Sequence, residues 1–341
     1  MRGLSRYPSE VKKGSILILS LWVLGILSVF VLYLNQGMRA RITLAKRLTY
    51  DTLLHSLASS GVKKAIMELK KDNTPSDSLK DDWANNPQVF KDFRLGDGSF
   101  TVSYQIRSYK DSEVKTYFGV VDEASKLNIN TVDRRTLKRL LEAFGVDEIQ
   151  AEEIAAAIVD WRDQDSFLSI PIGSAEDSYY TNLDLPYPCK DSPFQVLDEL
   201  LLVKGMNKEL FDKVKDYLTV FGDGKVNINT ATFPILKALG LRDKLVEKIV
   251  RYRKGEDEEW GTSDDRVFTQ LQTIVPQLTK VYYLSAEEIN SLNNLISTHR
   301  LTTSSSTFLI RSRATLVFSP LGKEITCVVD RKGKILFWRE L

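Results

Sequence analysis

The sequence predicts an α+β protein in which a long N-terminal helix packs on an antiparallel sheet, and a large α-helical insertion interrupts that sheet. Three observations lead to this prediction. An apolar run passes without a break into an amphipathic helical pattern. Alternating apolar and polar residues occur in two groups far apart in the chain. Between these groups, a helical segment contains an internal repeat.

The apolar run is long enough to cross a membrane. Residues 15–34 carry no charge, and this run of 20 residues spans about 30 Å as a helix, which matches a bilayer core. A cleaved secretory signal has a shorter apolar region that ends in small residues, and no such site follows this run. Because Arg2, Arg6, Lys12 and Lys13 precede the run, we expect a cytoplasmic N-terminus and a chain that lies outside the cytoplasm beyond residue 39.

The helical pattern continues to residue 71. Residues 39–71 contain no proline, and Gly61 is their only glycine. A narrow stripe of apolar and small residues recurs at spacings of three and four, at Leu54, Leu57, Gly61, Ala65 and Leu69. We therefore predict one helix over residues 15–71, about 85 Å long, whose first half lies in the membrane and whose second half packs on a domain.

The two groups of strands belong to one domain. Residues 98–109 and 114–123 are expected to form paired strands, and residues 306–319, 323–331 and 333–341 give three more. Each group is too small to be a stable sheet alone. We therefore assign residues 35–125 and 301–341 to a single domain, with residues 126–300 inserted in it.

The insertion is a duplication. "KLNINTVDRRTLKRLLEAFG" at residues 126–145 matches "KVNINTATFPILKALG" at residues 225–240, which predicts a first copy over 126–222 and a second over 223–300. Thr131 and Thr230 are predicted to cap the first helix of each copy, and Gly145 and Gly240 to end it.

This pattern is similar to the helix-hairpin-helix repeats of competence-type DNA receptors, in which backbone amides of a hairpin contact phosphate. A membrane-tethered DNA-binding or DNA-uptake protein is therefore the alternative function. Against it, residues 126–222 hold 11 Lys plus Arg and 18 Asp plus Glu, a formal charge of −7, which repels a phosphate backbone. Nucleic acid is therefore not the expected partner.

A long loop lies within the first copy, between Arg162 and Phe194. It begins within "DWRDQDSFLSIPIGSAEDSYY" and carries Asp163, Asp165, Glu176 and Asp177. Carboxylate oxygens are the hard donors that calcium selects. The loop lacks the regular spacing of an EF-hand, so a solvated acidic loop is the other interpretation.

The remaining chemistry-bearing residues are few. Cys189 and Cys327 could form one disulfide in an oxidising compartment, or remain two unpaired thiols. The sequence has two histidines and no zinc or redox motif. We find no nucleophile elbow, phosphate loop or histidine-based dyad, so we do not expect an enzyme.

The N-terminal segment resembles the leader of type IV pilin-like proteins. A short basic leader and Gly14 are followed by a long apolar half-helix and then by "LASSGVKKAIMELKK". On this resemblance residues 1–14 are a leader, prepilin peptidase cuts after Gly14, and Ser15 becomes a methylated N-terminus. Most pilin-like subunits carry Glu at the fifth mature position, where this chain has Leu19. Without that carboxylate the subunit cannot pair with a neighbour's N-terminal amine, which suits the end of a filament.

The whole chain resembles the general secretion pathway protein K family, the large minor pseudopilins of type II secretion. The leader without the fifth-position Glu, the "KLNINT" junction, "VDWRDQD", "GSAEDSYY", "LDELLLVKGM" and the closing strands carry this resemblance.

The resemblance implies a non-enzymatic protein of the bacterial inner membrane, with its bulk in the periplasm at the tip of a pseudopilus that supports export of folded proteins. It implies minor pseudopilins I and J, the major pseudopilin, prepilin peptidase and the inner-membrane assembly platform as partners. It also implies calcium in the helical insertion, and for calcium we carry it over to Asp163, Asp165, Glu176 and Asp177.

Overall fold

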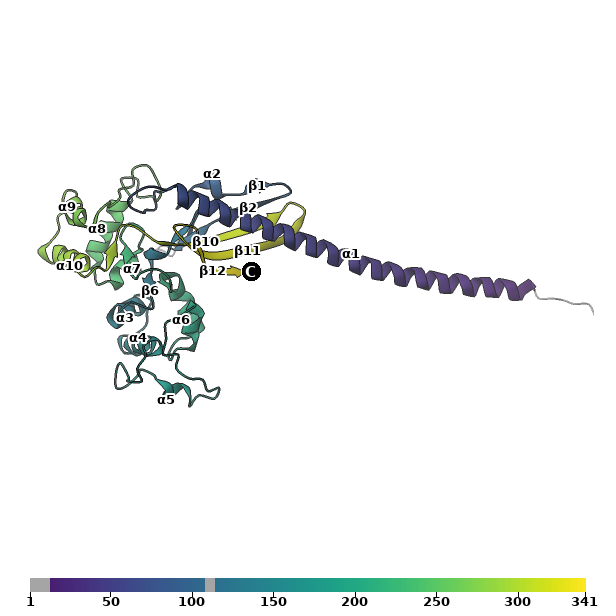
Figure 1. Cartoon of the computed structure of the whole chain (residues 1–341), viewed down its shortest axis with the longest axis horizontal. Helices are drawn as coiled ribbons and strands as arrows, with labels where there is room; N and C mark the ends of the chain where they lie inside the picture. Colours follow the sequence, from purple (N-terminus) through teal and green to yellow (C-terminus); the bar gives the residue numbers. More distant parts are fainter. Residues whose placement is uncertain (1–12, 108–113) are drawn as a thin grey trace, which may run out of the picture. The chain divides into compact units, whose positions relative to one another are not determined.

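The structure is a computed structural model that describes residues 13–107 and 114–341. The predicted leader, residues 1–14, lies outside the described part of the chain except for its last two residues. The chain divides into two units, Met1–Leu54 and His55–Leu341, which we describe separately (Figure 1).

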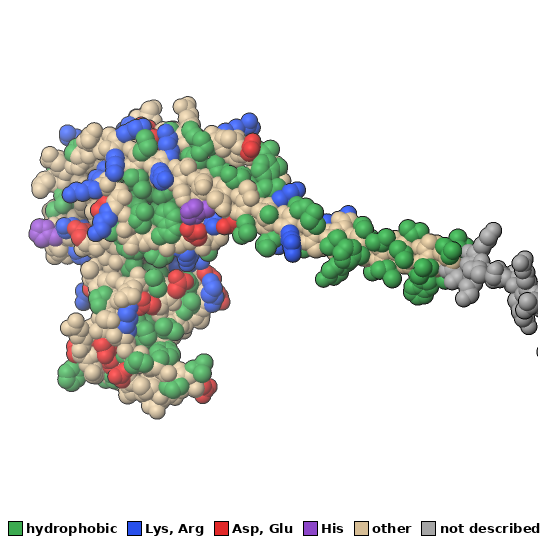
Figure 2. All heavy atoms as spheres, turned by 45° about the vertical axis from the view of Figure 1, so that its right-hand side comes forward, with side chains coloured by type: hydrophobic (Ala, Val, Ile, Leu, Met, Phe, Trp, Pro, Cys, Tyr) green, Lys and Arg blue, Asp and Glu red, His purple; other side chains and the backbone are tan. Residues whose placement is uncertain are grey.

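Helix α1, Lys13–Lys71, begins in the first unit and ends in the second, and it covers the residues for which the sequence predicts one helix. In the first unit it exposes its apolar side chains along the whole run from Ile16 to Leu34 (Figure 2). The hydroxyls of Ser20 and Ser28 donate to the carbonyl oxygens of Leu17 and Leu24, each at 2.8 Å, so both hydroxyls are satisfied within the helix. The helix is long and apolar enough to cross a membrane.

In the second unit, the last turns of α1 pack on the sheet of the same chain. A Cβ atom at Gly61 would lie 2.1 Å from Ser312 Oγ and 2.9 Å from a ring carbon of Phe100, so glycine is required for this close approach. Leu57, Ala65 and Leu69 of the predicted stripe are also buried. The stripe therefore packs within this chain.

The main sheet combines strands from both ends of the second unit. Its order is β1 (Phe93–Leu95), β2 (Gly98–Val102), β10 (Thr307–Leu316), β11 (Ser319–Asp330) and β12 (Ile335–Glu340), and β5 (Val121–Asp122) also pairs with β10. All these pairs are antiparallel. The α+β fold class predicted from the sequence is confirmed.

The pairing within the first strand group differs from the prediction. Strand β3 (Tyr104–Arg107) does pair with β4 (Val114–Tyr117), but as a separate two-stranded sheet, while β2 pairs with β10 of the C-terminal group. The physical reason is that β10 is long enough to receive β2 at one end and β5 at the other, with Ser312 opposite Val102 and Phe308 opposite Asp122. Alternation in the sequence reports which residues form strands and not which strands pair.

The insertion contains two short helical copies around one apolar core. The first copy consists of β6 (Leu127–Asn128), α3 (Arg134–Ala143), α4 (Glu148–Arg162), α5 (Asp177–Tyr180), the 3-10 helix η2 (Leu197–Leu202), α6 (Lys208–Val214) and β7 (Leu218–Thr219). The second consists of β8 (Val226–Asn227), α7 (Phe233–Ala238), α8 (Asp243–Arg253), the 3-10 helix η4 (Leu271–Thr273), α9 (Ile274–Thr279), α10 (Ala286–Ser297) and β9 (Leu301–Thr302). In each copy the first and last strands pair in parallel.

The repeated Asn-x-Asn-Thr segment explains the duplication in the sequence. Asn130 exchanges two hydrogen bonds with the backbone of Phe194, at 3.0 and 2.7 Å, and Asn229 exchanges two with Phe268, both at 2.9 Å. Each asparagine thus ties the start of its copy to the segment that comes after the loop. Because Asn130 and Asn229 make the same pair of hydrogen bonds in their own copies, the Asn-x-Asn-Thr segment occurs in both.

The first helix of each copy begins later than the sequence predicts. Helices α3 and α7 begin after Asp133 and Thr232, so Thr131 and Thr230 lie in the preceding turn and are not the N-caps. The Asp133 carboxylate accepts a hydrogen bond from the backbone N–H of Thr136, which is the usual capping contact. Gly145 and Gly240 lie just after the helix ends with φ of 86° and 96°, as predicted for helix-ending glycines.

A buried carboxylate joins the sheet to the insertion. Asp122, at the end of β5, accepts hydrogen bonds at one oxygen from Asn227 Nδ2, Thr230 Oγ1 and Ser305 Oγ, at 3.0, 2.5 and 2.7 Å. Asn227 Nδ2 also donates to the carbonyl oxygen of Asp77, beyond the end of α1. Burial raises the pKa of Asp122 to about 6. This network holds four distant segments together.

We expect Asp122→Ala to lower the free energy of unfolding by about 3 kcal/mol, because it leaves the buried hydroxyls of Thr230 and Ser305 without their acceptor. The raised pKa means that the folded state holds this proton more tightly than the unfolded state, so the contribution of Asp122 falls as pH rises from 3.8 to about 6. The loss should therefore be larger at mildly acidic than at neutral pH. Chemical denaturation measures it, with exposed Asp184→Ala as control; equal stability of the two variants would contradict the joining role.

Candidate functional site: an acidic cluster in the first copy

The end of α4 places the first acidic residues of the site. Arg162, its last residue, donates hydrogen bonds to the carbonyl oxygens of Ile129 and Val132, which fixes the helix end against the start of the copy. Asp160 lies two residues before Arg162 and is buried, and Asp163 is the C-cap with an extended backbone. The chain then leaves the helix as the long loop predicted from the sequence.

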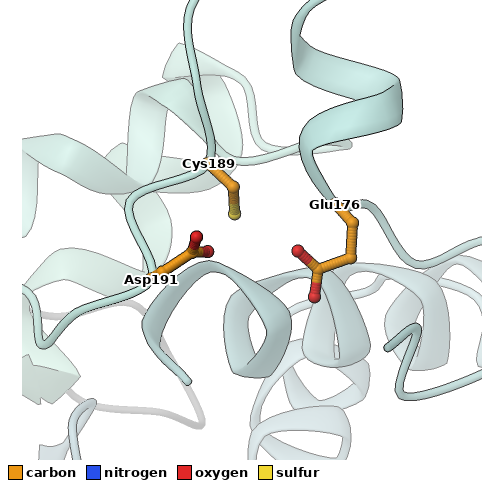
Figure 3. A group of neighbouring side chains, drawn as sticks. All are labelled: Glu176, Cys189 and Asp191. Atoms are coloured by element: carbon orange, nitrogen blue, oxygen red, sulfur yellow. The ribbon is translucent and has the colours of Figure 1, made fainter. Parts of the chain in front are cut away.

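Two groups of ligand atoms converge, and they share Glu176. The oxygens of Asp163, Asp165 and Glu176 lie within 4.8 Å of one another, and so do the ligand atoms of Glu176, Cys189 and Asp191. Figure 3 shows Glu176, Cys189 and Asp191 reaching toward a common space from separate segments. The loop therefore folds back so that its two ends face α4.

The carboxyl groups of the cluster repel one another. Burial, followed by the charges of Asp160 and Asp163, raises the pKa of Glu176 to about 7. Burial, followed by Asp165 and Asp160, raises the pKa of Asp163 to about 6. Burial also raises the pKa of Cys189 to about 12, so its sulfur is a neutral thiol near pH 7. The cluster thus has carboxylate donors and no thiolate, which suits a hard cation.

Unpartnered buried oxygens support a cation site. One side-chain oxygen each of Asp160, Asp163, Glu176 and Asp191 is buried and accepts no hydrogen bond from the described residues. Buried carboxylate oxygens without donors are costly, and a divalent cation would satisfy several at once. The residues present therefore fit a calcium ion, with Asp160, Asp163, Glu176 and Asp191 as its candidate ligands and Asp165 beside them.

Three of the four predicted ligands, Asp163, Asp165 and Glu176, lie together. Asp177 does not join them, because its Oδ1 accepts the backbone N–H of Cys189 at 2.7 Å and so fastens one part of the loop to another. Asp160 and Asp191 were not predicted from the sequence. A carboxylate inside the apolar stretch of α4 was the available signal for Asp160, whereas nothing local in the sequence distinguishes Asp191.

The other predicted site residues lie elsewhere. Cys189 and Cys327 are both buried free thiols, one in this loop and one in β11, so the disulfide interpretation is not realised. Gly14 and Ser15 lie within α1, although their side chains are outside the described part of the structure. Leu19 is exposed in the apolar half of α1.

A second acidic group, Asp257, Asp264 and Asp265, lies in the matching loop of the second copy. Its carboxylates accept hydrogen bonds from their own loop: Asp264 from the backbone of Glu256 at 2.6 Å, and Asp265 from Gly261 at 2.8 Å. None of these oxygens is among the unpartnered buried atoms of the described residues. The two copies therefore differ at this position.

The fold defines a class of protein. An exposed apolar half-helix that continues into a helix packed on an antiparallel sheet is the architecture of a pilin-like subunit, here with a duplicated helical insertion. Residues 120–223, which hold the acidic cluster, match the model of a family described as type II secretion system (T2SS), protein K.

Curated relatives have the same description. Type II secretion system protein K of Aeromonas hydrophila is 28% identical over 238 residues, 65% of this chain and 69% of that protein. The protein K of Pectobacterium carotovorum subsp. carotovorum is 30% identical over 143 residues, 39% of this chain, and the match spans only 43% of that protein. This chain is therefore similar to type II secretion system protein K, over residues 120–223 for the family model and over 65% of its length for the Aeromonas protein.

A solved structure has a similar fold. A chain of the GspK-GspI-GspJ complex from enterotoxigenic Escherichia coli superposes with a TM-score of 0.60 at 20% identity, covering 89% of this chain and 99% of that one. At this identity the similarity concerns the fold, and it includes the combination of sheet and helical insertion.

The raised pKa of Glu176 predicts a pH dependence in the absence of divalent cations. Its folded-state pKa of about 7 exceeds the unfolded value of 4.5, so its contribution to the free energy of unfolding should fall as pH rises through this range. Glu176→Gln should flatten the fall and be more stable than the unsubstituted protein above neutral pH. Denaturation in a chelating buffer tests this, with exposed Glu209→Gln as control. A slope unchanged by Glu176→Gln would rule out the repulsion inferred here.

Proposed function

We propose that this protein is a non-enzymatic minor pseudopilin of a type II secretion system and supports export of folded proteins across the outer membrane. The main support for this proposal is that one chain combines an apolar half-helix, a pilin-like sheet and a helical insertion. The first copy of that insertion lies in the residues that match the protein K family model. The structural role depends on packing and assembly, and it assigns no reaction to the acidic cluster.

The membrane anchor is the apolar half of α1. In this proposal it crosses the inner membrane once, with the N-terminus in the cytoplasm and the second unit in the periplasm, because the basic residues precede the run. Prepilin peptidase removes the leader after Gly14 and Ser15 becomes the methylated N-terminus. The chain is then a substrate of that enzyme.

Counterparts of the minor pseudopilins I and J are the proposed partners, together with the major pseudopilin and the inner-membrane assembly platform. The structure of similar fold is a complex of GspK with GspI and GspJ, which supports the first two. Leu19 cannot pair with a neighbour's N-terminal amine, which supports a position at the tip of the pseudopilus. The bulk of the insertion would hinder addition of a further subunit above it.

Calcium is the proposed ligand of the acidic cluster. Four unpartnered buried oxygens on three separate segments would be drawn to one ion, and the charge of the ion would remove the repulsion among the carboxylates. Bound calcium would fasten the long loop to α4. The ion has a structural role in this proposal, because it stabilises the shape of the first copy.

The DNA-receptor alternative has no observation in its favour. The matched relatives are secretion proteins, and the first copy has a formal charge of −7. Duplicated helices with repeated hydrogen-bonding asparagines serve here as a scaffold for two loops.

Calcium should stabilise the full chain by about 2.7 kcal/mol at a concentration of 100 times Kd, and magnesium should do so less because it tolerates this irregular donor set poorly. Asp163→Asn should abolish most of the gain, whereas Asp184→Asn in the same loop should retain it. Thermal unfolding with and without calcium measures both. An equal calcium response in the two variants would exclude the assigned cluster.

Coexpression with prepilin peptidase and the I and J counterparts tests the pseudopilin proposal. We expect the intact mass of a chain that begins at Ser15 with one added methyl group, and copurification of I and J from detergent extracts. Gly14→Val should leave the leader uncut, while Gly37→Val, also in α1, should not affect cleavage. An uncut chain that retains no I or J in the presence of active peptidase would overturn the proposal.

A further inference from the structure

The second copy borders a pocket of about 680 Å³, at the place where it meets the β3–β4 sheet. Helices α7 and α8 and the loop after α8 form one side, with Phe233, Lys244 and Trp260 among the lining residues. Tyr117 of β4 lines the other side. The volume falls in the range of ligand sites, and a junction between two structural parts is a common place for one.

The pocket lining is strongly basic. It contains six basic residues and two acidic ones, Glu247 and Glu258. The basic residues are Lys115, Lys244, Lys248, Arg251, Arg253 and Lys254.

Some of the positive charges are balanced and others are not. Lys115 pairs with Glu259 at 2.9 Å and Lys248 with Glu288 at 2.8 Å. Lys254 Nζ instead donates to the carbonyl oxygen of Glu258 at 2.7 Å, and Arg253 forms no ion pair with the described residues. Positive charge therefore remains at the end of α8.

Arg253 is the unusual residue of this pocket, because its side chain is 3% exposed and lacks a full set of acceptors. One terminal nitrogen donates to the carbonyl oxygen of Ala231 at 2.6 Å, but Nε has no partner among the described residues. The corresponding Arg162 of the first copy donates to two carbonyl oxygens. Burial lowers the pKa of Arg253 to about 9, and the charge of the nearby Asp265 only partly offsets that cost.

Two further groups support a ligand at this place. The Thr232 hydroxyl also lines the pocket, and it too is buried without a partner among the described residues. The Trp260 ring lies 4.6 Å from the guanidinium carbon of Arg253 and 5.2 Å from Lys254 Nζ. A partly exposed indole therefore lies over the buried charge, and both residues line the pocket.

We propose that this pocket binds a carboxylate carried on an apolar or aromatic body, with the carboxylate near Arg253 and Lys254 and the body against Trp260 and Phe233. A guanidinium, an ammonium and a hydroxyl can together satisfy one singly charged anion, and the aromatic walls favour an apolar body. The carboxylate comes either from a small molecule or from an acidic residue of a peptide segment. The proposed site depends on the lining of this pocket and not on the proposed secretion function.

The test titrates the detergent-solubilised full chain with phenylacetate and, as a neutral probe of the same shape, with phenylacetamide. We expect phenylacetate to bind with Kd on the order of 1 mM and phenylacetamide about tenfold more weakly. Lys254→Ala and Thr232→Val should each weaken phenylacetate severalfold. Lys237→Ala, on α7 but outside the pocket lining, is the matched control and should have no effect.

A second arm compares acetyl-Glu-Phe-amide with acetyl-Gln-Phe-amide. Tighter binding of the glutamyl peptide than of phenylacetate would support a peptide ligand, and the reverse order would support a small-molecule ligand. Equal binding of charged and neutral probes, or equal effects of Lys254→Ala and Lys237→Ala, would overturn the proposal. So would saturation by inorganic phosphate with no response to either carboxylate probe.

Discussion

The buried carboxylate of Asp122 is the constraint on which the architecture of the second unit depends. It accepts hydrogen bonds from the second helical copy and from the segment that leads into β10, and Asn227 extends the network to the backbone of Asp77. Three segments far apart in the chain thus meet at this carboxylate, and a fourth joins them through Asn227. Because an unpaired donor is costly inside a protein, these segments can hardly separate one at a time. The insertion is therefore fixed to the sheet and is not a loosely tethered addition.

The duplicated unit shows how one scaffold supports two different surfaces. Asn130 and Asn229 make the same pair of hydrogen bonds, and Arg162 and Arg253 occupy the same helix-end position. The residue after that arginine differs between the copies: it is Asp163 in the first and Lys254 in the second. The unpartnered buried atoms differ as well, because they are carboxylate oxygens in the first copy and include the Nε of Arg253 in the second. The hydrogen bonds of Asn130 and Asn229 do not involve the residue after the helix. That residue could therefore be acidic in one copy and basic in the other without disturbing the fold. The first copy then suits a cation and the second an anion.

Sequence patterns predicted many of the helices and strands, because these elements depend on the types and spacing of neighbouring residues. The helix ending at Lys71, the glycines after α3 and α7, and the C-terminal strands all follow from neighbouring residues. Strand partners and ligand sets are not local properties. The pairing of β2 with β10 depends on what lies beside β10 in space, and Asp191 reaches the cluster only because the loop returns to α4. Asp177 is adjacent to Glu176 in sequence, but its carboxylate accepts the backbone N–H of Cys189, a contact that also depends on how the loop folds back.

The placement of β10 also bears on the order in which the domain can form. This strand pairs with β2, β5 and β11, yet it begins at Thr307 and its first partner, β2, ends at Val102. During synthesis, both helical copies emerge before β10 does, and each can close through its own short parallel strands. The main sheet cannot form until β10, β11 and β12, at the end of the chain, have been synthesised. Contacts across such a sequence separation form slowly, so the close packing of Gly61 against Ser312 of β10 is completed only when the last part of the chain has folded.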